Sequence, residues 1–326
     1  MGSCDKNKVM DLAEAVKRFV PPGAHISIGG FTLNRNPMAA VHEIIRQGIG
    51  DLHLYAHSNG QGVDELIGAG AVSRLEIAYC GTGRFAPTCI RFRKAVESGR
   101  IRVEDYSNYQ MTLRFMAGAM GVPFLPTRSG LGSDIATCWG FDRQMRAADP
   151  RLPDHKLCVL DNPFGNWADT ARVVLVPAIN PDVTIIHAQQ ADCQGTVRLQ
   201  GLAFADIEQA KAARHLIVTC EELVDPEHLR ADGDRNHIPF FCVDAVVPLP
   251  MGAWPTACYG RYDYDPVFLA DYDRWAKDEA LFEAFLQRYV YQVAGHTQML
   301  DLVGPDHLAR LKADPACGYA AGLDRR

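Results

Sequence analysis

The chain has 326 residues, of which 48 % are hydrophobic and 22 % charged, and its formal net charge is −6. This composition is typical of a globular protein with a large core, and the acidic balance disfavours nucleic-acid binding, which usually needs a basic surface. No segment approaches the roughly 20 apolar residues of a membrane-spanning helix, and the N-terminus has no apolar signal region. We therefore expect a cytoplasmic protein that contacts neither nucleic acid nor a membrane.

The first third of the chain alternates predicted strands and helices. Strands are expected at 24–30, 51–57, 74–80 and 102–107, and helices at 10–19, 36–46, 91–97 and 110–121, with another helix ending at 67. Asn36 and Pro37 have the pattern of an N-cap followed by a first-turn proline. Strand–loop–helix units at a spacing of roughly 30 residues predict parallel strands with crossover helices. The fold class is therefore an α/β protein with an open, mostly parallel, doubly wound sheet flanked by helices.

The remainder of the chain continues this pattern after a break. Residues 122–140 are rich in proline and glycine, and 142–156 resemble a polar surface insertion. Three further strands are expected within 171–201, then a helix and a strand within 206–224. An aromatic loop at 252–265 either lines a pocket or closes the core. We expect one domain, 1–326, with its core at about 8–265 and a helical tail at about 266–326.

Glycine-rich segments follow the first three strands: "GGF" at 29–31, "SNGQG" at 58–62 and "GTGRF" at 81–85. Ligands of open parallel sheets bind outside the carboxyl ends of the strands, so these segments are candidate binding loops. The amides of Gly29, Gly30 and Phe31 would suit an oxyanion, and Arg35 would suit a carboxylate. A tight turn beside a surface arginine explains the same residues, and the sequence leaves both interpretations open.

Motifs for other chemistries are missing. No G-x-S-x-G nucleophile motif and no phosphate-binding glycine motif is present. The ten cysteines and eleven histidines lack the paired spacing of zinc sites, so we expect reduced thiols and no metal. The residues alone therefore indicate an enzyme-like scaffold without a convincing nucleophile.

Ordered segments along most of the chain carry a family resemblance. They include "HISIGGFTLNRNPMAAVHEIIRQGIGDL", "VPFLPTRSGLGSD", "DVTIIHAQQADCQGTVR" and "GAWPTACYGRYDYD". In this order, over about residues 8–315, the chain resembles the alpha subunits of family I CoA-transferases, of the glutaconate CoA-transferase group. The resemblance implies the CoA-transferase fold, and a reaction that moves CoA from an acyl-CoA to a small carboxylic or dicarboxylic acid.

The same resemblance implies a divided active site. The catalytic glutamate belongs to a partner beta subunit, so no catalytic nucleophile is expected here, and the two chains form alpha–beta pairs. Coenzyme A is a cosubstrate and no cofactor is permanently bound. The resemblance also implies that residues at the strand ends, and residues before and within the "SGLGSD" loop, bind the oxyanion and the acid. They are Gly29, Gly30, Phe31, Arg35, Ser58, Arg128, Ser129, Gly130, Leu131, Gly132 and Ser133. Either Arg35 or Arg128 would bind the acid's remote carboxylate.

Alternatives remain on the same fold. Related alpha subunits belong to a ring-opening CoA-ester hydrolase of steroid breakdown and to a decarboxylase of glutaconyl-CoA type. The hydrolase uses a glutamate near the position that Asn108 occupies in this chain, and the asparagine argues against that activity. Glu104 and Asp105 are near enough in the sequence to keep the hydrolase alternative open. A ligand-binding module is a further alternative. A nucleophile within this chain would be sought at Glu104, Glu221 or Glu222.

Overall fold

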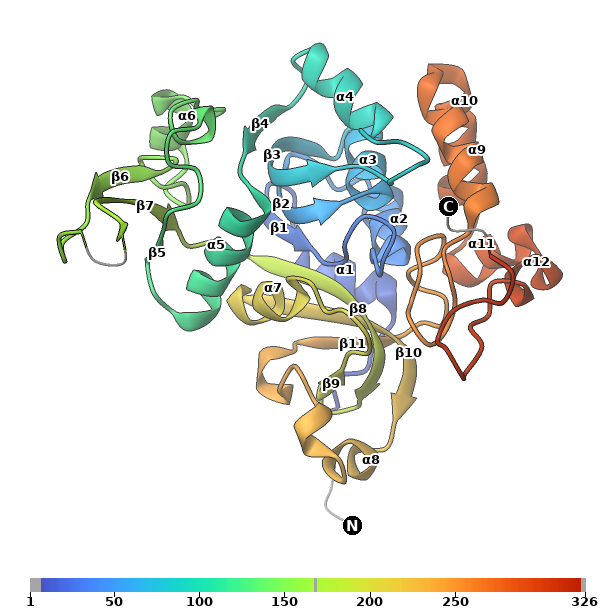
Figure 1. The fold of residues 1–326 in the computed structure, drawn as a ribbon. Helices are drawn as coiled ribbons and strands as arrows, with labels where there is room; N and C mark the ends of the chain where they lie inside the picture. The colour runs from blue at the N-terminus through green and yellow to red at the C-terminus, as the bar shows by residue number, and fades with distance from the viewer. Residues whose placement is uncertain (1–6, 167–168, 324–326) are drawn as a thin grey trace.

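The computed structural model describes residues 7–166 and 169–323 and is built on an eight-stranded sheet (Figure 1). Its order is β11–β10–β8–β1–β2–β3–β4, with β9 beside β8. Every pair along this path is parallel, and only β9 runs antiparallel to its neighbour. The strands are β1 (His25–Ile28), β2 (Leu52–Asn59), β3 (Val72–Cys80), β4 (Arg102–Asp105), β8 (Val183–Asp192), β9 (Val197–Arg198), β10 (His215–Val224) and β11 (Ala245–Pro248). The expected mostly parallel sheet is confirmed.

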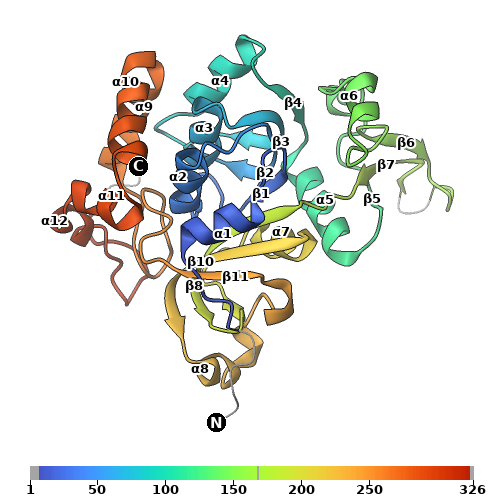
Figure 2. The same ribbon diagram turned by 180° about the vertical axis from the view of Figure 1, so that it is seen from behind.

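Helices cover both faces of this sheet, which explains why β1 and β2 are buried at every position (Figures 1 and 2). One face carries α1 (Leu12–Phe19), α2 (Met38–Arg46), α3 (Gln61–Gly68) and α4 (Ile90–Glu97). The other carries α5 (Asn108–Met120) and α7 (Asp206–Ala212). The expected helical tail contains α9 (Pro266–Lys277), α10 (Glu279–Leu286), α11 (His296–Val303) and α12 (Pro305–Ala309). Its α9 packs against α4.

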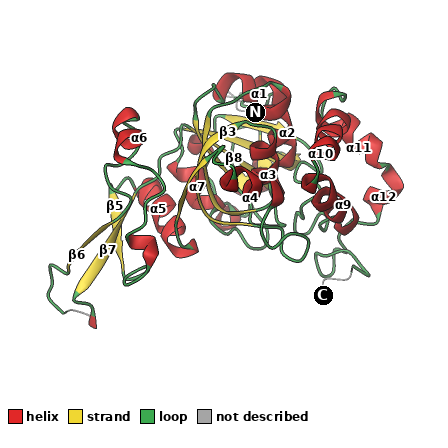
Figure 3. Cartoon of the chain, turned by 90° about the horizontal axis from the view of Figure 1, so that it is seen from above, coloured by secondary structure: helices red, strands yellow, loops and turns green. Residues whose placement is uncertain are grey.

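A second sheet was not expected from the sequence. Strands β5 (Phe124–Thr127), β7 (Arg172–Pro177) and β6 (Cys158–Asp161) form an antiparallel sheet in that order. It lies at the end of the molecule opposite α9 to α12 (Figure 3). The proline- and glycine-rich stretch 122–140 thus supplies one strand, and the polar insertion contains α6 (Arg143–Ala148).

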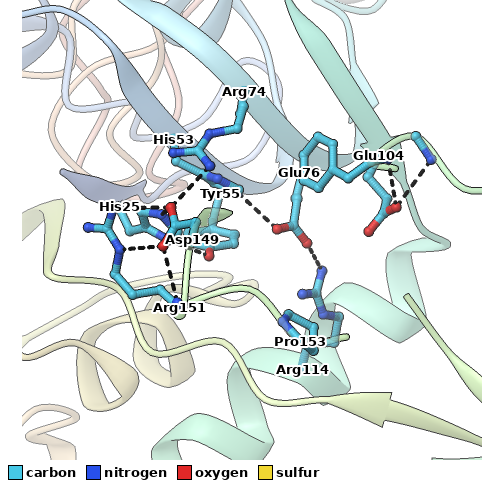
Figure 4. A network of polar contacts seen from close by, with 12 residues as sticks. His25, His53, Tyr55, Arg74, Glu76, Glu104, Arg114, Asp149, Arg151 and Pro153 are labelled. Atoms are coloured by element: carbon cyan, nitrogen blue, oxygen red, sulfur yellow. Dashed lines mark hydrogen bonds and ion pairs between the residues drawn. The ribbon is translucent and has the colours of Figure 1, made fainter. Parts of the chain in front are cut away.

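A buried charge network joins this insertion to the amino ends of β1 and β2 (Figure 4). The Nε2 atom of His25 lies 2.9 Å from an Asp149 carboxylate oxygen, and Arg74 and Arg151 also pair with Asp149. Beside it, His53 stacks on His25 and hydrogen-bonds to Glu76. Burial, together with the charge of His53, lowers the pKa of His25 to about 4. This network lies at the amino ends of the strands, whereas the glycine-rich segments follow their carboxyl ends.

Two expected boundaries are wrong in detail. Helix α2 begins at Met38 with Pro37 at the N-cap, because the Asn36 side chain instead donates to the Asn34 carbonyl. The "SNGQG" loop is mostly regular structure, since Ser58 and Asn59 end β2 and α3 begins at Gln61. Within the described residues, no helix is long and apolar enough to cross a membrane, and no disulfide links the cysteines.

Candidate functional site

The three glycine-rich segments meet at the carboxyl edge of the sheet, because β1, β2 and β3 are neighbours. The Thr32 N–H donates to the Ser58 carbonyl over 3.1 Å. Between them, a Cβ on Gly60 would lie only 2.6 Å from the Thr32 carbonyl oxygen and 3.1 Å from that of Gly81. A side chain would not fit there, so glycine allows the three segments to pack together.

The amides that follow β1 already have acceptors within the chain. The Gly29 N–H donates to the Ile185 carbonyl over 2.9 Å, and the Phe31 N–H donates to the Asn34 carbonyl over 2.8 Å. The Gly30 N–H donates to Oδ1 of Asp206 over 2.8 Å. An oxyanion role for these three amides would require the existing hydrogen bonds to open.

Arg35 lies in the core rather than on the surface. Its side chain is only 2 % exposed and forms an ion pair of 3.0 Å with Asp206. A second guanidinium N–H group donates to the Leu202 carbonyl over 2.7 Å. Because Asp206 already balances its charge, Arg35 is poorly placed to attract a substrate carboxylate.

Ser58 connects β2 to α5. Its hydroxyl donates to Oδ1 of Asn108, the first residue of α5. The adjacent His57 shares a hydrogen bond of 2.9 Å with the Thr112 hydroxyl, and its ring lies 5.6 Å from that of Phe31. Ser58 is fully buried, so these contacts join the turn after β1, the end of β2 and the start of α5 from within.

The "SGLGSD" loop lies at the N-terminus of α5. Ser107 and Gln110 form a capping box there, and the Ser107 hydroxyl lies 3.2 Å from that of Ser129. Gln110 also donates to the Ser129 carbonyl over 3.0 Å, while the Ser133 hydroxyl donates to the Gly130 carbonyl. The loop is thus held at the same end of α5 that Ser58 contacts.

The amides of Gly130 and Gly132 in this loop lack an acceptor within the described residues. The φ angles of these glycines are +90° and +71°, a left-handed conformation that glycine adopts readily. Leu131, between them, is half-buried and packs on the core beside α5, and its N–H donates to the Arg128 carbonyl. The loop therefore presents backbone donors of a kind that Gly29, Gly30 and Phe31 do not.

Arg128 precedes this loop and is exposed. Its guanidinium lies 3.4 Å from the Thr170 hydroxyl. It lines a largely apolar hollow of about 550 Å³ on the three-stranded sheet, together with Phe124, Pro126, Thr127, Leu160, Asn162, Pro163, Phe164, Thr170, Val173 and Leu175. Of the two arginines predicted to bind an acid, Arg128 is the accessible one.

A second cavity, of about 660 Å³, lies beside the turn after β1. Its walls come from that turn, from the segment before α7 and from the aromatic loop: Thr32, Leu33, Asn34, Arg35, Gly201, Leu202, Phe204, Ala257, Tyr259, Tyr262, Asp263, Tyr264 and Tyr319. The aromatic loop thus lines a pocket, one of its two expected roles. No pattern in the sequence indicated that Phe204 or Asp206 belongs to this region.

The candidate carboxylate nucleophiles of this chain are all engaged. Glu104 is buried, pairs with Arg146 and accepts the amides of Gly140 and Phe141. Glu222 pairs with Arg261.

Glu221 is engaged as firmly as the other two. Burial alone would raise its pKa, but hydrogen bonds from His187, Met251 and Tyr262 hold that pKa below its usual value. Structural pairing of this kind does not suit attack on a thioester.

Among the residues that the structure describes, one group of side chains has metal-ligand chemistry: His187, Glu221 and Cys258, whose ligand atoms lie within 4.8 Å of one another. Both ring nitrogens of His187 are used, since Nδ1 lies 2.8 Å from the Thr219 hydroxyl and Nε2 lies 2.6 Å from Glu221. A metal ion would have to displace the Glu221 contact. The hydrogen bonds explain this group without an ion.

Comparison with known proteins identifies relatives. The profile of the coenzyme A transferase family matches residues 9–248. The sequence is 42 % identical over 313 residues to the alpha (A) subunit of glutaconate CoA-transferase from Acidaminococcus fermentans, covering 96 % of this chain and 97 % of that one. The crystal structure of that organism's enzyme contains a similar chain, with a TM-score of 0.92 over 97 % of this chain and 98 % of that one.

Two further relatives are more distant. The alpha (A) subunit of 3-oxoadipate CoA-transferase from Pseudomonas knackmussii is 35 % identical over 287 residues, covering 87 % of this chain and 93 % of that one. A chain of the decarboxylase AibA/AibB has 31 % identity and a TM-score of 0.68, covering 86 % of this chain and 99 % of that one.

Proposed function

This chain belongs to the coenzyme A transferase family as the alpha subunit of a heteromeric enzyme, and we propose that the enzyme transfers CoA to a small dicarboxylic acid. The relatives named for glutaconate and 3-oxoadipate transfer support an acid with two carboxylates. The single observation that carries the proposal is the "SGLGSD" loop, where the Gly130 and Gly132 amides have no acceptor in the described chain and an exposed arginine lies beside them in sequence.

The nucleophile is supplied by the beta subunit in this proposal. Its glutamate oxygen attacks the thioester carbon of the acyl-CoA, and the CoA thiolate leaves, which forms an acyl–glutamyl anhydride. The thiolate then attacks the glutamyl carbonyl and releases the first acid. The engagement of Glu104, Glu221 and Glu222 supports placing this residue in the other chain.

The alpha subunit stabilises charge in these steps. Each attack passes through a tetrahedral oxyanion, and a preorganised amide donor contributes about 3 kcal/mol to its stabilisation. The Gly130 and Gly132 amides fill this role, because donating to an oxyanion costs them no existing hydrogen bond within the described residues.

Arg128 binds the remote carboxylate of the acid. An exposed guanidinium can form a two-point contact with a carboxylate, and the apolar hollow beside it suits the intervening carbon chain. Arg35 instead contributes to the scaffold through its pair with Asp206.

The test is CoA transfer from acetyl-CoA to a panel of mono- and dicarboxylic acids, with this chain, its partner and the pair. The proposal predicts transfer by the pair alone and faster transfer to dicarboxylates than to monocarboxylates of equal length. Transfer by this chain alone, or equal rates for both acid classes, would contradict it.

Decarboxylation is the second candidate, favoured by the similarity to AibA/AibB. It predicts release of CO₂ from an unsaturated dicarboxylic acyl-CoA by the same pair, with the CoA thioester intact. Measurement of CO₂ and of free acid in the same assay separates the two activities.

A further inference from the structure

We propose that Asp206 is a positioning residue of the transfer site, whose buried carboxylate holds the β1 turn, defined as Gly29 to Arg35, in its working conformation. This inference rests on the proposed function and adds a residue that acts through the turn rather than on substrate. It also explains why the glycine pair after β1 is followed by an arginine.

The contacts of Asp206 span the whole turn. Asp206 is the first residue of α7 and is 0 % exposed. Its Oδ1 accepts the Gly30 N–H over 2.8 Å, and its Oδ2 accepts an Arg35 N–H over 3.0 Å. One carboxylate therefore binds both ends of the turn, which is also anchored by the Thr32 N–H on the Ser58 carbonyl and the Arg35 N–H on the Ala257 carbonyl.

The fit around Gly29 leaves no space for movement toward α7. A Cβ on Gly29 would lie 2.8 Å from the Ile186 side chain and 3.0 Å from Oδ1 of Asp206. Such spacing is closer than van der Waals contact allows, so Asp206 packs directly on bare backbone. The carboxylate is thus a steric support of the turn as well as a hydrogen-bond acceptor.

The β1 turn and the segment before α7 also contain strained backbone. Three of the six non-glycine residues with positive φ in the described chain are Thr32, Arg35 and Phe204, at +46°, +47° and +52°. Side chains adopt this conformation only where the surroundings impose it, and such strain concentrates at functional sites. Asp206, which contacts Arg35 and lies two residues after Phe204, is the charged group that joins these strained positions.

The β1 turn connects Asp206 to the end of β2 through ring contacts and a hydrogen bond. Phe204 stacks on Phe31 with ring centroids 4.4 Å apart and an interplanar angle of 8°. The Phe31 ring also lies 5.6 Å from that of His57, which precedes Ser58, and the Thr32 N–H donates to the Ser58 carbonyl. A displaced turn would therefore shift the end of β2 and, through the Ser58 contact with Asn108, the start of α5 on which the "SGLGSD" loop rests.

The experiment compares Asp206→Asn with the matched control Asp64→Asn in the complete enzyme, with both of its chains present. Asp64 is also fully buried and accepts a backbone amide, that of Phe92 over 2.7 Å, and a side-chain donor, the Tyr272 hydroxyl over 2.8 Å. Its carboxylate binds residues of α4 and α9 and has no hydrogen bond to the β1 turn within the described residues. Both variants lose one buried carboxylate, and they differ in whether the turn is affected.

Misplacement of reacting groups by about 1 Å lowers rates by about 100-fold, so Asp206→Asn should lower kcat about 10- to 100-fold. The KM for the acid should change less than about threefold, because Asp206 does not contact substrate, and kcat of Asp64→Asn should remain within about twofold of the wild type. Hydrogen exchange of residues 26–36 should be faster only in Asp206→Asn. If Asp206→Asn fails to fold, Asp206→Glu takes its place. It keeps the charge but moves the carboxylate, and it should also lower kcat.

Wild-type kcat in Asp206→Asn or Asp206→Glu, or a loss equal to that of Asp64→Asn, would overturn the proposal. Unchanged hydrogen exchange at 26–36 would overturn it as well. If the wild-type pair transfers no CoA, the proposed function fails, and the exchange comparison still decides whether Asp206 fixes the turn.

Discussion

Arg146 approaches both carboxylate oxygens of Glu104 through a single guanidinium nitrogen, at 2.6 Å and 2.5 Å. Both side chains are at most 2 % exposed. Glu104→Gln leaves the Arg146 charge unbalanced, so the free energy of unfolding should fall by about 3 kcal/mol. Because Glu104 is structural, kcat of the folded pair should stay within about twofold of the wild type. Denaturant unfolding and steady-state transfer measure the two effects.

Arg146→Met provides the control, since it breaks the same ion pair but leaves the Glu104 carboxylate in place. It should destabilise the chain similarly. A loss of kcat of a thousandfold or so in Glu104→Gln alone, the size expected when a nucleophile is removed, would identify Glu104 as a reacting group.

Arg128→Gln should raise the KM for a dicarboxylic acid about tenfold with little change in kcat, because a charge-assisted hydrogen bond contributes about 1.5 kcal/mol or more. The matched control is Arg172→Gln on the neighbouring strand β7, where Arg172 is 59 % exposed. Steady-state kinetics with a dicarboxylate and a monocarboxylate of equal length should show the rise for the dicarboxylate only. An unchanged KM in Arg128→Gln would remove Arg128 from the acid site.

Ser107→Ala removes both the N-cap of α5 and the contact with Ser129. The lost cap should lower the free energy of unfolding by about 1 kcal/mol. A displaced "SGLGSD" loop should lower kcat as well. Asp142→Ala is the control, since Asp142 caps α6 by accepting the Met145 N–H over 2.8 Å. Equal kcat in the two variants, at equal loss of stability, would contradict a role of this loop in catalysis.

The His25 network makes stability depend on pH. The pKa of His25 is lowered from 6.5 to about 4, chiefly by burial, so the unfolded chain binds a proton at a higher pH than the folded chain. Neutral His25 makes its full contribution to the free energy of unfolding above pH 6.5, and that contribution is lost as the pH falls toward 4. The free energy of unfolding should therefore decline across this window, and His25→Gln should flatten the decline. An identical pH profile in the variant would exclude His25 as its source.

The sequence predicted the parallel sheet because strand and helix periodicities are local, and because three glycine-rich segments follow three strands at regular spacing. It did not predict the second sheet, whose strands β5 and β7 are separated by a long stretch of polar and proline-rich chain. Nor did it reveal that Arg35 pairs with Asp206, since the two are 171 positions apart. Tertiary pairing decides whether an arginine is buried or accessible, and no local pattern encodes it.

The division of the active site between two chains is tested most directly by mass spectrometry of the two separated chains after the pair is incubated with acetyl-CoA. CoA should become attached as a thioester to the partner, and the mass of this chain should remain unchanged. Attachment of CoA to a glutamate of this chain would contradict it, whichever acid the enzyme uses.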